Sequence, residues 1–262
     1  MQQFVIERGF RRGLIIIISI FIFSFFEVYA CENCSNYDNQ DFKVQNVSVT
    51  HHPWIAATVW EIEVKGKAGN TKPVPAGQLN GAPVLGYVFP TNLSPEVAGF
   101  GNAEGILALA LTSHPDFDDT PLWDESGDGN YDNDGGVWHP HWVVLTQDER
   151  VEGGFSVLEF NPKDESVTMP PTNPGMPMYM DSPGFQVITD GNKIRTVVPD
   201  YRIRFNTEFN FDVVTCFMMV DTGEAEEGSS HGNGEMPMLG VYRVYDVASG
   251  DLSLPYSVQA AK

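Results

Sequence analysis

The chain has 262 residues, of which 42% are hydrophobic, and its 35 acidic against 15 basic side chains give a formal net charge of −20. This charge disfavours nucleic acids and anionic membrane surfaces as partners, and it suits divalent cations, cationic ligands or simple solubility. The length and the apolar fraction predict one domain with a sizeable core.

The first thirty residues have the pattern of a secretory signal peptide. Three arginines between positions 8 and 12 precede an apolar run over 14–26, and small residues stand at Val28 and Ala30. The run is shorter than the roughly 18 residues of a spanning helix, and no later segment is long enough to span a membrane. We therefore expect cleavage after Ala30 and a single secreted or periplasmic domain over 31–262.

The three cysteines leave two questions open. In an oxidising compartment Cys31 and Cys34 can close a small loop, or one of them can link the N-terminus to Cys216. Cys31 would also carry the lipid if the preceding residues served as a lipobox, so a lipoprotein is the alternative to a freely exported chain.

Short apolar runs dominate the remainder of the chain. Residues 58–65 alternate apolar and polar side chains, which predicts a strand with one buried face. Similar runs between Gly, Pro, Asn and Asp predict strands at 84–89, 106–111, 137–145, 155–160, 185–189, 194–198, 202–205, 209–220 and 239–247, of which 106–111 could instead be a helical turn. No long amphipathic helix is visible. The pattern predicts an all-β fold, an antiparallel β-sandwich of Greek-key or jelly-roll type with long irregular loops.

An acidic connection follows the run at 106–111. Oxygen-bearing side chains alternate before the glycines at 135 and 136, namely Asp128, Asn130, Asp132 and Asp134. The last three match the start of a calcium-loop consensus, but the twelfth place is His141 and not Glu, so we expect a calcium loop without flanking helices. Further acids in the same connection would complete the calcium site: Asp116, Asp118, Asp119, Asp124 and Glu125.

A pair of histidines ends the connection. In a strand, His139 and His141 lie on one face, where both imidazoles can reach one metal ion. Pro140 between them cannot donate a backbone hydrogen bond, so we expect an edge of the sheet there. With Trp138 and Trp142 on the opposite face packing inward, the metal would lie in a surface site or cleft.

A third ligand is expected from His114, because it opens the same connection that His139 closes. His51, His52 and His231 have no partner at a spacing that a strand would align, so ordinary roles are expected for them. Thioethers alternate with prolines in two further segments, at Met176, Met178 and Met180 and at Met236 and Met238, which favours copper slightly over zinc; the alternative is that they fill gaps in the core.

These residues predict an exported metal-binding protein with a calcium-stabilised loop and a copper or zinc site, and more readily a binding protein than an enzyme. A metal-dependent enzyme using the same histidines is one alternative, which a deep pocket beside them would favour. A module that binds carbohydrate or another exported protein is the second alternative. Two or more tryptophans exposed on one flat face would favour it.

Overall fold

The computed structural model describes residues 33–119, 124, 129, 135–223 and 236–261. The expected signal peptide at 1–30, Cys31 and His231 lie outside the described residues. So do the four side chains proposed for calcium, which are Asp128, Asn130, Asp132 and Asp134. No helix in the described part of the chain is long and apolar enough to cross a membrane.

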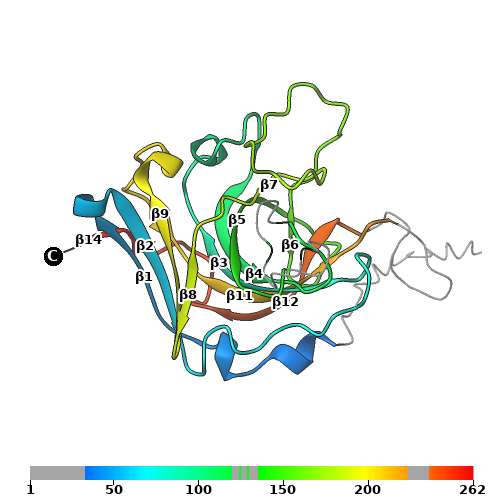
Figure 1. Cartoon of the computed structure of the whole chain (residues 1–262), viewed down its shortest axis with the longest axis horizontal. Helices are drawn as coiled ribbons and strands as arrows, with labels where there is room; N and C mark the ends of the chain where they lie inside the picture. Colours follow the sequence, from blue (N-terminus) through cyan, green and yellow to red (C-terminus); the bar gives the residue numbers. More distant parts are fainter. Residues whose placement is uncertain (1–32, 120–123, 125–128, 130–134, 224–235, 262) are drawn as a thin grey trace, which may run out of the picture.

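The described residues form strands joined by loops and single 3-10 turns (Figure 1). The strands are β1 (Val44–His52), β2 (Ala57–Val64), β3 (Pro83–Pro90), β4 (Ile106–Ser113), β5 (His139–Gln147), β6 (Phe155–Val157), β7 (Met180–Asp181), β8 (Val187–Asp190), β9 (Lys193–Pro199), β10 (Asn210–Phe211), β11 (Val214–Val220), β12 (Leu239–Val247), β13 (Tyr256–Ser257) and β14 (Gln259–Ala260). The 3-10 helices are η1 (Cys34–Tyr37), η2 (Gln40–Phe42), η3 (Pro53–Ile55), η4 (Pro95–Ala98) and η6 (Asp200–Ile203).

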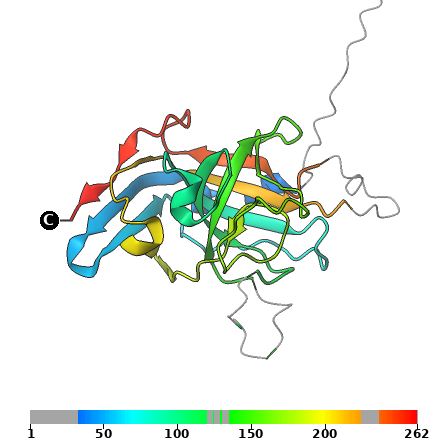
Figure 2. The same ribbon diagram turned by 90° about the horizontal axis from the view of Figure 1, so that it is seen from above.

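Two main sheets make up the fold. The smaller has the strand order β14-β1-β2-β9-β8, and the larger has the order β4-β3-β11-β12-β6-β5-β7. An additional β4–β5 pairing closes the larger sheet into a six-stranded barrel, and the smaller sheet lies beside it (Figures 1 and 2). The all-β, antiparallel class is confirmed, with β1–β14 as a parallel exception. The expected sandwich is replaced by a barrel with a sheet packed against it.

Small inward side chains explain how the barrel closes. Gly86, Ala108 and Ala110 occupy the inner face of neighbouring strands, where bulkier side chains would keep the strands apart. A Cβ atom at Gly86 would lie 2.8 Å from the Met218 methyl group. The curvature therefore depends on glycine and alanine at the positions where β3 and β4 face inward.

Two neighbouring barrel strands are buried on both faces. Every residue of β3 and β11 is buried, because one face lines the barrel interior and the other packs toward the smaller sheet. Trp60 of β2 anchors this outer core, with its ring 5.8 Å from Trp142 of β5 and 5.3 Å from Phe89 of β3. Apolar runs without alternation, such as 84–89, follow from this double burial.

Most of the expected strands are present, and the run at 106–111 is strand β4 and not a helical turn. The exception is 202–205, which falls in and just after the 3-10 helix η6. Arg204 and Phe205 have φ values of 48° and 61°, which a regular strand does not allow. The strand β1 was not predicted.

The cysteines have separate fates. Cys34 is disulfide-bonded, whereas Cys216 carries a free and buried thiol in β11. The alternative in which Cys216 links the N-terminus is therefore wrong.

Candidate metal centre

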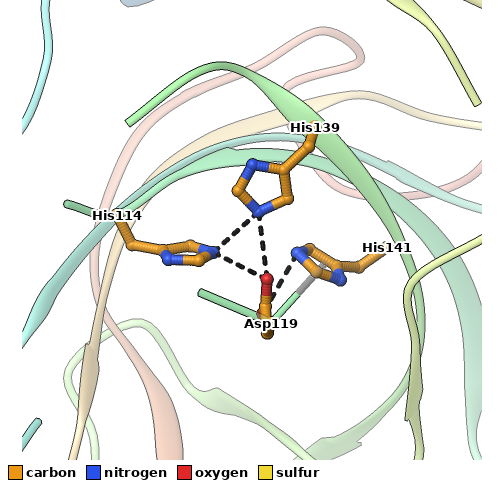
Figure 3. Close-up of side chains that lie close together, drawn as sticks. All are labelled: His114, Asp119, His139 and His141. Atoms are coloured by element: carbon orange, nitrogen blue, oxygen red, sulfur yellow. Dashed lines mark hydrogen bonds and ion pairs between the residues drawn. The ribbon is translucent and has the colours of Figure 1, made fainter. Parts of the chain in front are cut away.

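Three histidines and one aspartate meet inside one end of the barrel (Figure 3). His139 and His141 lie on the inner face at the start of β5, opposite Thr112 and Ala110 of β4. His114 follows the last residue of β4, and Asp119 lies five positions further along the connection. The β4–β5 pairing thus brings together side chains from both ends of the connection.

The spacing of the four side chains fits one metal ion. One ligand atom from each residue lies within 4.8 Å of all the others. The His114 and His139 Nε2 atoms are 2.8 Å apart, and Asp119 Oδ1 lies 3.3 and 3.2 Å from them. His141 Nε2 is 3.3 Å from Asp119 Oδ2. Tetrahedral bonds of 2.0–2.1 Å place neighbouring ligand atoms about 3.3 Å apart, so the cluster has nearly the dimensions of such a site.

Contacts with backbone carbonyl groups direct the Nε2 lone pairs of His114 and His139 to the centre of the cluster. His114 Nδ1 lies 3.0 Å from the Phe117 carbonyl oxygen, and His139 Nδ1 lies 2.7 Å from that of Val137. A carbonyl only accepts hydrogen bonds, so each Nδ1 donates, and in the neutral ring Nε2 carries a lone pair. His141 Nδ1 lies 3.1 Å from the Ser182 hydroxyl. Such outer contacts orient metal-bound histidines in proteins.

Without a cation, the cluster leaves buried polar atoms unsatisfied. Asp119 Oδ1 and His141 Nε2 are buried and have no hydrogen-bond partner among the described residues. Burial lowers the pKa of His141 to about 3, which favours the neutral ring. A carboxylate facing neutral imidazole lone pairs needs a cation between them.

The backbone beside His114 is shaped by a glycine. Gly135 accepts a hydrogen bond from the His114 backbone N–H at 2.7 Å and has a φ of 92°. A Cβ atom there would lie 2.3 Å from the carbonyl oxygens of His114 and Phe117. Phe117 also stacks on the His114 ring, with centroids 4.1 Å apart. Glycine is thus required where the connection returns to β5.

The cluster borders a cavity of about 390 Å³ inside the barrel. His114, Asp119 and His141 form part of its wall, and most of the remaining wall is aliphatic or thioether side chains from the barrel strands. The histidines therefore do not occupy the surface site or cleft expected from the sequence. Both faces of β5 are buried, with the imidazoles inside the barrel and Trp138 and Trp142 in the outer core.

The structure brings together His114, His139 and His141, the three histidines proposed as ligands from the sequence. The fourth member, Asp119, is one of the acids that the sequence predicts for the calcium site, and its five-residue separation from His114 is the signal in the sequence that points to the histidine cluster. Its neighbour Asp116 points elsewhere, since its carboxylate accepts hydrogen bonds from the backbone N–H groups of Ala76 and Gly77.

The other two histidines that the structure describes lie on the smaller sheet. His51 Nε2 is 2.9 Å from Asp200 Oδ2, and the His52 ring meets the edge of Trp54. Neither belongs to the metal-sized cluster.

Among the strands that the structure describes, Pro140 is paired on one side only. β5 pairs with β4 along residues 139–145, whereas β6 joins its other side at Leu145 and β7 at Trp142. The missing N–H of Pro140 is thus compatible with its position, as the sequence led us to expect.

The methionines at 176, 178 and 180 line the cavity together with Met218. Met236 belongs to the core between the barrel and the smaller sheet, and Met238 packs against the barrel interior. Their thioethers are therefore part of the apolar interior. This is the packing role that the sequence offers as the alternative to copper binding.

Comparisons with protein-family models, curated proteins and solved structures give no match. The functional assignment therefore depends on the geometry of this site.

Proposed function

We propose that the chain is an exported protein that binds one transition-metal ion through His114, Asp119, His139 and His141. Export is inferred from the leader pattern at 1–30. The observation that carries the metal assignment is the convergence of three imidazole Nε2 atoms and a carboxylate at distances close to those of a tetrahedral site.

Zinc and copper are the candidate ions. Imidazole suits both, and a carboxylate with three imidazoles at tetrahedral spacing favours zinc. The methionine pattern in the sequence favours copper. It is less favoured here because a thioether-lined apolar cavity accounts for Met176, Met178 and Met180.

Elemental analysis of the full chain, purified from an exporting host without chelating resin, tests this proposal. We expect about one zinc or copper ion per chain, lost in the double variant His139→Ala with His141→Ala. The matched control is His51→Ala with His52→Ala, because it also removes two imidazoles, but from the smaller sheet, away from the cluster. Equal metal content in both double variants, or none in the wild type, would contradict the proposal.

The same measurement addresses the calcium loop. Calcium lost only with Asp132→Asn and Asp134→Asn would place a second ion in the connection, separate from the histidine cluster.

A metal-dependent enzyme is the second candidate function, and the cavity bordered by His114, Asp119 and His141 favours it. A bound metal ion would supply Lewis acidity there, and the apolar wall would exclude water from a substrate. Turnover of an acyl ester by the metal-loaded protein, abolished by His141→Ala, is the corresponding test.

The carbohydrate-binding alternative has less support. Trp60, Trp138 and Trp142 are buried, and of the tryptophans that the structure describes Trp54 alone is strongly exposed, at 79%. A flat aromatic face is therefore not offered by the described tryptophans.

A further inference from the structure

We propose that the barrel cavity binds an aliphatic monocarboxylate, with the carboxylate on the metal centre and the alkyl chain along the barrel. This inference rests on the proposed metal-binding function and names the ligand class of the same site.

The cavity has polar side chains at two places and an apolar wall between them. Thr112, His114, Asp119 and His141 lie at one end of the barrel. Gln147, at the other end of β5, and Asp251 are the polar residues of the opposite end. The stretch of β5 from His141 to Gln147 spans about 20 Å along the strand, and less along the barrel axis because barrel strands are tilted.

The wall suits a hydrocarbon chain. Between the two ends, inward side chains of β3, β5, β6, β11 and β12 supply aliphatic groups and thioethers, for example Val143, Val157 and Met218. A volume of about 390 Å³ lies within the range of small-molecule sites. The occupant predicted by this shape is long, narrow and almost entirely apolar.

The charge of the metal centre selects the head group. A divalent ion with three neutral imidazoles and the Asp119 carboxylate has a net charge of +1. An uncompensated charge is costly inside an apolar barrel, and a ligand with one negative charge removes it. His114, Asp119 and His141 border the cavity whereas His139 is not part of its wall, so a fifth ligand would approach from the cavity side.

The opposite end of the cavity carries backbone strain. Leu252 and Leu254 line it and have φ values of 58° and 55°, a region that leucine rarely adopts. Such strain is found where a segment is held against a ligand, and here it holds two leucines at the place where the end of an alkyl chain would lie.

The test uses the full chain loaded with cobalt, which replaces zinc and reports on the metal through its visible absorption. Acetate, butyrate, octanoate and dodecanoate are titrated by calorimetry and by absorption. We expect affinity to rise about fourfold per methylene until the chain fills the cavity, with a cobalt spectral change at each saturation.

Two variants separate the cavity from the metal. Val157→Phe places a ring in the apolar part of the cavity, away from the histidines, and should lower dodecanoate affinity at least a hundredfold while one cobalt ion stays bound. Val74→Phe makes the same change at a site that is 69% exposed and should leave both properties unchanged.

Each contrary result has a distinct meaning. One cobalt ion bound with no dependence on chain length overturns this inference and leaves the metal-binding function standing. Equal carboxylate affinity in metal-free protein, or an unchanged cobalt spectrum, also overturns it, because the metal would not be the anchor. Failure of the wild type to bind any metal overturns the proposed function and this inference together.

Discussion

Replacing Asp119 with asparagine should change stability in a way that depends on whether metal is present. The substitution keeps the shape of the side chain and removes a buried carboxylate whose Oδ1 has no hydrogen-bond partner among the described residues. In metal-free protein the amide of the variant can donate to the lone pair of His141 Nε2, 3.3 Å from Asp119 Oδ2 in the wild type. We therefore expect the metal-free variant to lie within about 1 kcal/mol of the wild type.

In the presence of metal the variant should be clearly less stable. Losing outer-shell contacts already lowers metal affinity 10–100-fold, so loss of a direct carboxylate ligand should cost about a hundredfold or more. At saturating metal this corresponds to about 2.7 kcal/mol of lost stabilisation. For a protein of this size that is a difference of roughly 5–11 °C in Tm.

The measurement is thermal unfolding followed by circular dichroism, with excess zinc and with chelator. Asp118→Asn is the matched control, because it makes the same chemical change one position away, outside the four-residue cluster. A wild-type Tm that zinc does not raise would refute the reasoning. So would an equal loss for Asp119→Asn in zinc and in chelator.

Three further predictions concern other parts of the fold. Gly135→Ala should lower the free energy of unfolding, measured by denaturation, and the zinc affinity, measured by calorimetry, because its Cβ atom would lie 2.3 Å from two carbonyl oxygens. The control is Gly175→Ala, where φ is 84° and no atom lies within 4 Å of the added Cβ, so only the backbone effect of about 1 kcal/mol is expected. Burial raises the pKa of the Cys216 thiol to about 12. A thiol reagent at pH 8 should therefore label Cys216 at least a hundredfold faster in denaturant than in the native protein, and equal labelling rates would contradict its burial. Burial raises the pKa of Asp148, but hydrogen bonds from Arg150 and Ser156 outweigh this effect and hold it below its ordinary value. Its stabilising contribution should be complete above about pH 4 and be lost as pH falls below that, so Asp148→Asn should flatten the acid side of a stability profile, and an unchanged profile would refute this.

The strands could be predicted from the sequence because apolar runs between turn residues report burial directly. Barrel closure could not, because it depends on the β4–β5 pairing across a long connection and on small residues such as Gly86 facing the interior. The strand predicted at 202–205 is wrong, because the alternating pattern of this run gives no sign of the positive φ values at Arg204 and Phe205.

The histidine cluster was partly accessible from the sequence. Spacing places His139 and His141 on one face of a strand, and the shared connection points to His114. Asp119 was not separable from the other acids, because charge alone does not say which carboxylate turns inward. The burial of both faces of β5 could not be predicted either, because a strand with apolar residues on one face and histidines on the other resembles a strand with one face exposed to solvent.

The pairing of β4 with β5 has a consequence for folding. Side chains alternate between the two faces of a strand, so a slip of one residue in this pairing would turn His139 and His141 out of the barrel and direct Trp138 and Trp142 into it. His114, at the end of β4, can share an ion with the two β5 histidines only when the strands are correctly aligned. A metal ion that binds during folding would therefore stabilise the native register of β4 and β5. The apolar side chains of the two strands do not by themselves distinguish this register from the alternatives.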